Sequence, residues 1–211
     1  MDNKKLILVG GGGHCKSVID VAESTGWTIL GILDLDENVG KEILGYPTIG
    51  NDNQIPAFIQ QSFFLVTVGQ IKNVELRIKL HERILMAGGK LATVIASDAY
   101  VSKHAEIGKG TVIMHKAVVN AGAKIGLGCI INTMANIEHD AVIGDYCHIS
   151  TGAMINGACN IGDRIFMGSG SVLANGVCVA SDCVIAAASF IRKSIVQSGF
   201  YAGNPAIIIH K

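Results

Sequence analysis

The chain has 211 residues, its 17 lysines and arginines are balanced by 17 aspartates and glutamates, and only 16% of its residues are charged. A neutral chain with so few charges lacks the basic surface that DNA, RNA or an anionic membrane requires, so these partners are disfavoured. The stretch Leu6–Gly13 is too short for a secretory signal, and no apolar run approaches the roughly 18 residues of a membrane span, so we expect a cytoplasmic protein.

Residues 1–97 alternate between strand-like and helix-like patterns. In chain order they predict a strand at 5–9, a helix at 15–24, a strand at 28–33, a strand at 62–68, a helix at 73–87 and a strand at 90–95. Strands that alternate with helices are typical of a parallel sheet. The sequence therefore predicts a small α/β, Rossmann-like domain of the nucleotide-binding kind at 1–97.

Four glycines, Gly10–Gly13, follow the first predicted strand and open onto the first helix. Free amides and the helix dipole at such a position favour a phosphate group. The dinucleotide fingerprint is incomplete, because its third glycine falls on Cys15 or Lys16, so a nucleoside diphosphate is favoured over NAD. Asp34, after the second predicted strand, could hydrogen-bond a ribose or a uracil. The alternatives are an ordinary strand-end cap and a tight glycine turn without a ligand.

From residue 98 onward the pattern changes to a period of six. Every sixth residue is a large apolar one: Val101, Ile107, Ile113, Val119, Ile125, Ile131, Ile137, Ile143, Ile149, Ile155, Ile161, Met167, Leu173, Val179, Ile185 and Ile191. The residue two places earlier is mostly small, as at Ala117, Ala135 and Cys147. This period fits neither a helix nor a long strand, and it predicts a solenoid of short strands over residues 98–211.

A second period, of 18 residues, is carried by Gly108, Gly126, Gly144 and Gly162. Three hexads therefore make one coil of triangular section, and the stacked coils share one continuous core. The glycines are expected where the backbone adopts a conformation, or a close approach, that a Cβ would forbid.

The six cysteines do not form a C-x-x-C motif. Four of them fall on the small inward register: Cys129, Cys147, Cys159 and Cys183. We expect these to be buried thiols that pack as small apolar groups, not metal ligands or disulfides. Cys15 and Cys178 lie outside the register, and no chemistry is assigned to them.

Two histidines of the repeat region have settings that suit catalysis. His139 lies between Glu138 and Asp140, and an imidazole with a carboxylate partner keeps one tautomer and gains basicity, as a general base requires. His148 follows half a coil later, so the two histidines are expected on different parts of the triangle and could meet across an interface between protomers. The alternative is a pair of solvated surface histidines. Outside the glycine loop, the other histidines are expected at the surface: His81, His104, His115 and His210.

Several motifs together resemble one enzyme family. They are Val9-Gly-Gly-Gly-Gly-His14, Ile32-Leu-Asp34, the hexad array, Ile137-Glu-His-Asp140 and Ala202-Gly-Asn-Pro-Ala206. The chain is similar over its whole length to sugar acetyltransferases of the UDP-N-acetylbacillosamine and perosamine N-acetyltransferase type, with the sialic acid O-acetyltransferases beside them. The resemblance implies an α/β Rossmann-like nucleotide-binding domain at 1–97, followed by an all-β left-handed parallel β-helix at 98–211.

The resemblance also implies an activity and an assembly. The enzyme would be a homotrimer with active sites between subunits, and acetyl-CoA would be its co-substrate without a metal. It would transfer the acetyl group to the 4-amine of a UDP-linked 4-amino-4,6-dideoxy sugar. A direct attack on the thioester, with both substrates bound at once, needs no acyl-enzyme.

Site residues follow from the same resemblance. The catalytic pair would be His139 as general base and Asp140, which stands where the family usually has a glutamate. The cofactor site would contain Asn132, His148, Ser169 and Ala187. The UDP-sugar site would contain Gly12, Gly13, His14, Asp34 and Gly69.

Two further departures from the family pattern concern substrate contacts. Asp34-Leu35-Asp36 replaces two adjacent acids, so only Asp34 transfers directly, and Ile207 stands where relatives often have a lysine. Arg192 and Lys193 could then serve the CoA phosphates, or they could be a solvated pair.

Three other functions stay open at this point. The first is O-acetylation of a sugar hydroxyl, as in sialic acid modification. The second is a trimeric β-helical zinc lyase, which needs three histidine ligands, with His115 as a candidate beside His139 and His148. The third is a scaffold without catalysis, which the His139–Asp140 pair disfavours.

Overall fold

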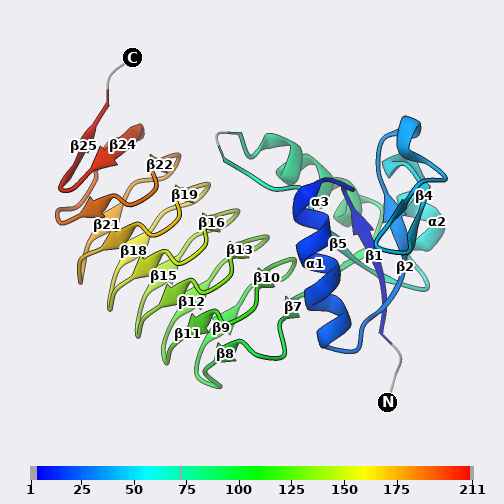
Figure 1. Cartoon of the computed structure of the whole chain (residues 1–211), viewed down its shortest axis with the longest axis horizontal. Coiled ribbons are helices and arrows are strands. Elements are labelled where there is room, and N and C mark those ends of the chain that lie inside the picture. Colours follow the sequence, from blue (N-terminus) through cyan, green and yellow to red (C-terminus); the bar gives the residue numbers. More distant parts are fainter. Residues whose placement is uncertain (1–3, 72, 210–211) are drawn as a thin grey trace. The chain divides into compact units, whose positions relative to one another are not determined.

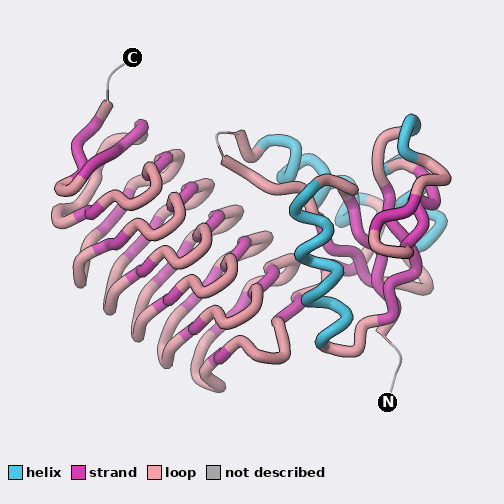
Figure 2. Tube along the Cα trace, viewed as in Figure 1, coloured by secondary structure: helices cyan, strands magenta, loops and turns pink. Residues whose placement is uncertain are grey.

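The computed structural model describes residues 4–71 and 73–209, and the chain divides into two compact units, Met1–Ser97 and Asp98–Lys211. The first unit mixes helices and strands, whereas residues 98–209 of the second are built from short strands and turns without a helix (Figure 2). Of the helices in the described ranges, none combines the length and apolarity that crossing a bilayer requires.

A six-stranded sheet organises the first unit, with the strand order β3-β4-β2-β1-β5-β6 (Figure 1). Its strands are β1 (Lys5–Val9), β2 (Thr28–Leu33), β3 (Glu42–Ile43), β4 (Tyr46–Gly50), β5 (Phe63–Val66) and β6 (Lys90–Leu91). The helices are α1 (Gly13–Ser24), α2 (Ile55–Phe58) and α3 (Glu75–Met86), with 3-10 turns at Asp36–Asn38 and Asp52–Gln54. Only β3 and β4 pair antiparallel within this described sheet. The predicted α/β fold with a parallel sheet is confirmed.

The first unit departs from the sequence-based expectation at two places. The strand predicted at 90–95 is interrupted, because β6 ends at Leu91 and a separate strand, β7, covers Val94–Ile95. The hairpin of β3 and β4 was not expected from the sequence. Its two-residue turn has positive φ at Leu44 (50°) and Gly45 (83°), as a type I′ turn requires, and a leucine in the first position hides that signal.

His81 does not lie at the surface, which corrects the prediction. It is fully buried on α3, and its Nδ1 lies 2.8 Å from the carbonyl oxygen of Arg77. Arg77, Leu80, His81 and Ile84 recur at the spacing of one helix face, and all four are buried. Because Arg77 donates to the buried side chain of Gln70, the inner face of α3 carries polar groups that a count of apolar residues overlooks.

Three faces of short parallel strands build the second unit. The first face contains β10 (Val112–Ile113), β13 (Ile130–Ile131), β16 (His148–Ile149), β19 (Phe166–Met167), β22 (Val184–Ile185) and β24 (Phe200–Gly203), with β25 (Ala206–Ile208) antiparallel to β24. The second face contains β8 (Tyr100–Val101), β11 (Val118–Val119), β14 (Asn136–Ile137), β17 (Met154–Ile155), β20 (Val172–Leu173) and β23 (Phe190–Ile191). The third face contains β9 (Glu106–Ile107), β12 (Lys124–Ile125), β15 (Val142–Ile143), β18 (Asn160–Ile161) and β21 (Cys178–Val179).

Strand pairing follows the 18-residue period of the sequence. Ile131 pairs with Ile149, Ile137 with Ile155 and Ile143 with Ile161, and the second partner always lies on the next coil (Figure 1). These aliphatic side chains are buried, each contributing on the order of 1.5–3 kcal/mol of burial free energy. The predicted parallel β-helix of three-strand coils is therefore confirmed.

The glycine column at Gly108, Gly126, Gly144 and Gly162 is explained by close approach, because φ is not positive at these positions. A Cβ added at Gly144 would lie 2.7 Å from the carbonyl carbon of Gly162 and 2.3 Å from Oδ1 of Asp163. That carboxylate oxygen accepts the backbone N–H of Asp145 at 2.9 Å. The column thus leaves room for side chains that bridge consecutive coils.

All six cysteines are free thiols. The four on the inward register are fully buried, as predicted, whereas Cys178 is exposed on the third face. Cys15 lies in the first turn of α1, a position that usually favours the thiolate. Burial outweighs this effect and raises the pKa of the Cys15 thiol to about 11, so the group stays protonated and unreactive near neutral pH.

Candidate active site

His139 and Asp140 form a hydrogen-bonded pair at a corner of the β-helix, directly after β14 and Glu138. The His139 Nδ1 lies 2.9 Å from Oδ2 of Asp140, which adopts a left-handed backbone conformation (φ 59°). Both side chains are exposed to solvent. With the Nδ1 proton donated to the carboxylate, Nε2 carries the lone pair, so this atom can accept a proton from a reactant.

Glu138 is held by two amide groups on the second face. Asn136 Nδ2 donates to Oε1 at 3.0 Å, and Asn120 Nδ2 donates to Oε2 at 2.9 Å. The bond from Asn136 is the largest influence and lowers the pKa of Glu138, against a smaller opposing effect of burial. The carboxylate beside His139 therefore stays ionised. Asn120 precedes Glu138 by one coil, and this 18-residue spacing is the signal that sequence reasoning missed.

His148 belongs to a different cluster, on the first face. The Asn132 Oδ1 accepts the N–H of Thr133 at 2.8 Å, which leaves the Asn132 Nδ2 to donate to His148 Nε2 at 3.1 Å. His148 is only 8% exposed and meets the Phe166 ring edge-on, with 5.2 Å between the ring centroids. Since Nε2 accepts, the proton of the neutral ring is on Nδ1.

Ser169 and Ala187 extend this face over the next coils. Ser169 Oγ lies 3.0 Å from Ser150 Oγ, and the N–H of Ala188 donates to the Ser169 carbonyl at 2.9 Å. The structure thus places Asn132, His148, Ser169 and Ala187 on consecutive coils along one side. His139 lies at the end of the second face, so the two histidines belong to different sides of one protomer, as the sequence predicts.

Three loops of the first unit meet at the carboxyl edge of its sheet. They follow β1, β2 and β5, which are parallel neighbours, and they carry Gly12, Asp34 and Gly69. A Cβ added at Gly69 would lie 3.6 Å from the Cβ of His14, so these predicted residues are neighbours. Ligands of open parallel sheets bind at this edge, because the loops there converge and helix N-termini point toward it.

The glycine loop has a tight half and an open half. A Cβ on Gly10 would lie 2.5 Å from Val68 Cγ2, and one on Gly11 would lie 2.6 Å from Asp34 Oδ2. Gly12 and Gly13, in contrast, have no atom within 4 Å of an added Cβ. Because α1 begins at Gly13 and Gly12 supplies no capping side chain, the amides at this helix end are available to an anion.

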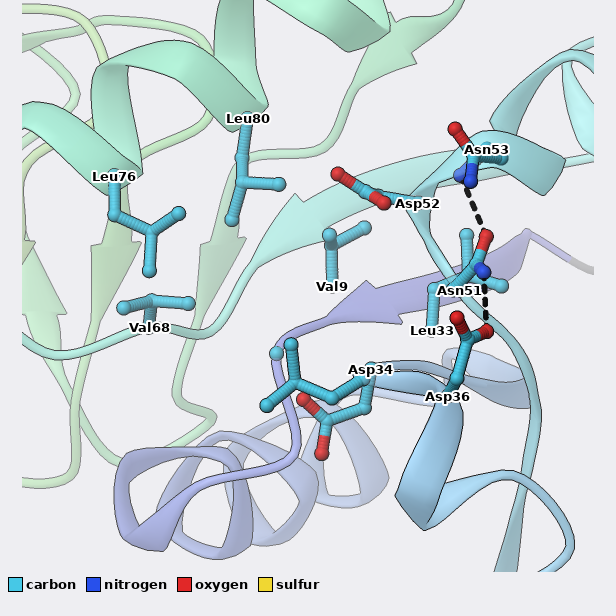
Figure 3. Close-up of a pocket in the computed structure, with 12 residues that line it drawn as sticks. Val9, Leu33, Asp34, Asp36, Asn51, Asp52, Asn53, Val68, Leu76 and Leu80 are labelled. Atoms are coloured by element: carbon cyan, nitrogen blue, oxygen red, sulfur yellow. Dashed lines mark hydrogen bonds between the residues drawn. The ribbon is translucent and has the colours of Figure 1, made fainter.

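A cavity of about 300 Å³ adjoins this loop (Figure 3). Leu76 and Leu80 of α3 face Val68 across one side of it, while Asp34 and Asp36 come from the segment after β2. Asp34 Oδ2 accepts from Asn38 Nδ2 at 2.8 Å, and Asp36 accepts from the Asn51 side chain. An apolar wall opposite hydrogen-bonding groups can take a flat base and a ribose.

A second cavity, of about 370 Å³, lies at the C-terminal end of the β-helix. Its lining includes Arg192, Lys193, Gln197, Tyr201 and Pro205. Arg192 and Lys193 are exposed cations at its edge, so the cavity can receive anionic groups.

The three histidines considered for a zinc site have separate partners. His115 Nδ1 lies 2.7 Å from Asp98 Oδ1, while His139 pairs with Asp140 and His148 with Asn132. In residues 4–71 and 73–209, no three histidine, cysteine, aspartate or glutamate side chains are grouped so as to hold a metal ion. His210 lies outside the described residues.

Comparison with known proteins supplies the family. Residues 5–84 match the PglD N-terminal domain, and no curated protein gave a match. PerB from Caulobacter crescentus, solved in complex with CoA and GDP-perosamine, is 31% identical, with a TM-score of 0.91 over 98% of this chain and 97% of that chain. The acetyltransferase domain of PglB from Neisseria gonorrhoeae FA1090, in complex with acetyl coenzyme A, is 35% identical, with a TM-score of 0.91 over 98% and 100% of the two chains.

Two further structures of the Caulobacter enzyme carry a histidine replaced by asparagine or by alanine, again with CoA and GDP-perosamine. All these similarities extend over both units of the chain. The chain therefore belongs to the sugar N-acetyltransferase family of the PglD and PerB type.

Proposed function

We propose that this protein transfers the acetyl group of acetyl-CoA to the amine of a nucleotide-linked amino sugar. The observation that carries the proposal is the His139–Asp140 pair, in which the 2.9 Å contact at Nδ1 leaves Nε2 as a solvent-facing proton acceptor. Family membership adds support, since relatives at 31% and 35% identity were solved with CoA or acetyl coenzyme A.

The acetyl-CoA site is assigned to the first face of the β-helix. Asn132, His148, Ser169 and Ala187 follow one another along consecutive coils there, which suits the long pantetheine arm. The cavity at the C-terminal end of the same unit carries Arg192 and Lys193, and these cations are assigned to the CoA phosphates.

The nucleotide of the acceptor is assigned to the edge of the sheet in the first unit. The amides around Gly12 and Gly13 at the start of α1 suit a diphosphate, with His14 and Gly69 beside them. Asp34, which lines the adjoining cavity, suits a ribose or a base. The expected acceptor is the 4-amine of a UDP-linked 4-amino-4,6-dideoxy sugar, while the Caulobacter relative was solved with GDP-perosamine, so both nucleotides belong in the test.

The chemical step is a direct transfer. His139 Nε2 takes a proton from the amine as its nitrogen attacks the thioester carbonyl, and Asp140 stabilises the imidazolium. The new C–N bond forms, the C–S bond breaks, and the CoA thiolate leaves and takes up a proton. Holding both substrates together replaces a bimolecular encounter, so no acyl-enzyme is needed.

His139 and His148 occupy different sides of one protomer, so a site containing both requires a second copy of the chain. A homotrimer with cyclic symmetry supplies three such sites, because every protomer then offers each face once. This assembly is part of the proposal.

A substrate panel tests the function. Purified protein is incubated with acetyl-CoA and with UDP- and GDP-linked 4-amino sugars, and free CoA and the product mass are measured. We expect CoA release together with one acetyl group on the amine of one of these sugars. Release only with hydroxyl-bearing sugars that lack the amine would indicate O-acetylation instead, and no release with any amino sugar would reject the proposal.

A further inference from the structure

Gly157 lies against the imidazole of His139. A Cβ added at Gly157 would lie 2.6 Å from Nε2, 2.8 Å from Cε1 and 3.3 Å from Cδ2 of that ring. The first two distances are shorter than carbon atoms tolerate in proteins, so one partner would have to move. The outer edge of the ring, including the proton-accepting atom, thus occupies space that any other residue at 157 would fill.

Backbone conformation does not explain the glycine. Gly157 does not have the positive φ that favours glycine. Its register mates one coil before and one coil after, His139 and Asn175, carry side chains, as does Ala121 two coils before. A Cβ is therefore compatible with this turn, and the requirement for glycine comes from what lies against it.

The backbone between the two coils is fixed by hydrogen bonds. The N–H of Ala158 donates to the His139 carbonyl at 3.0 Å, and the N–H of Gly176 donates to the Gly157 carbonyl at 3.0 Å. Because the coils cannot separate without breaking this ladder, the ring is the part that yields. A ring that turns away also leaves its 2.9 Å contact with Asp140.

We propose that Gly157 is a positioning residue for His139: its missing side chain makes room for the imidazole in the orientation that joins Nδ1 to Asp140 and leaves Nε2 for the reactant. The inference rests on the proposed function, in which His139 is the base. Gly122 lies against Asp140 in the same way, but its φ of +76° already accounts for the glycine there.

The test is Gly157→Ala, with Asn175→Ala as the control at the same register on the next coil. A misplaced catalytic group costs up to roughly 100-fold, so we expect kcat to fall about 10- to 100-fold while KM for both substrates stays within about twofold. Thermal stability is expected to be at least that of the parent, since the methyl restricts the unfolded chain. Asn175→Ala is expected to keep the parent kcat.

A double-mutant comparison separates positioning from direct obstruction. In a His139→Ala background, Gly157→Ala is expected to have no further effect, because the ring that it displaces is absent. A retained kcat in the single variant, an equal loss in both backgrounds, or a variant that fails to fold would each overturn the proposal.

Imidazole NMR supplies a readout that does not depend on turnover. The His139 ring signals are expected to change in Gly157→Ala and to stay unchanged in Asn175→Ala. A wild-type protein that acetylates no amino sugar would reject the proposed function, whereas unchanged ring signals would reject the role of Gly157 alone.

Discussion

Replacement of His139 by alanine is expected to lower kcat by roughly 10²- to 10⁴-fold, which corresponds to about 3–5 kcal/mol of activation free energy. The amine must lose a proton as it attacks the thioester, and in the structure the lone pair at Nε2 is oriented by the bond from Nδ1 to Asp140. The measurement is steady-state release of CoA at saturating concentrations of both substrates.

The variant is informative only if its fold and binding persist. His139 is exposed, so its truncation is expected to leave thermal unfolding and nucleotide binding at the parent values. His104→Ala, at another exposed histidine of the β-helix, is the matched control and is expected to keep full activity. Full activity in His139→Ala would remove the general base from the mechanism.

The largest expected effect on stability comes from the inward register of the β-helix. Ile143 is 2% exposed and stacks between Ile125 and Ile161 of the adjacent coils. Ile143→Ala removes three buried carbons and leaves a cavity, so the free energy of unfolding is expected to fall by about 2–5 kcal/mol. Denaturant unfolding of the purified protein measures this change.

Val142 offers a control on the same strand, because it precedes Ile143 and points outward with 38% exposure. Val142→Ala is expected to change the free energy of unfolding by less than about 1 kcal/mol, since little apolar surface leaves water at this position. Equal costs for the two variants would contradict the assignment of inward and outward positions.

The β-helix could be predicted from the sequence because its burial is strictly periodic. Each coil buries a large aliphatic side chain on the same three faces, so the hexads mark every strand and the 18-residue pairing follows from them. The cysteines on the small register were placed correctly for the same reason. Local sequence contains this information, since every contact repeats one coil later.

The first unit was harder to read, because its elements depend on distant contacts. The β3–β4 hairpin turns at Leu44 and Gly45, where nothing in the local pattern marks a turn beyond the glycine. His81 is buried because α3 packs it inward beside Arg77, which an apolar count does not register. Such positions depend on packing partners far along the chain.

The candidate site was predictable as residue types and not as contacts. The His139–Asp140 pair is adjacent in sequence, and its hydrogen bond was expected. The amides that hold Glu138 and the glycine that faces the His139 ring come from neighbouring coils, and they become visible only when residues 18 apart are compared. The roles of the nucleotide and CoA residues remain predictions.

The central claim is that one active site uses His139 of one protomer and His148 of another. Mixing inactive His139→Ala and His148→Ala proteins, with subunits exchanged by unfolding and refolding, tests it most directly. In randomly assembled closed trimers about a quarter of the sites would regain both histidines, so about a quarter of parental activity is predicted. A mixture no more active than the two separate variants would contradict the shared site.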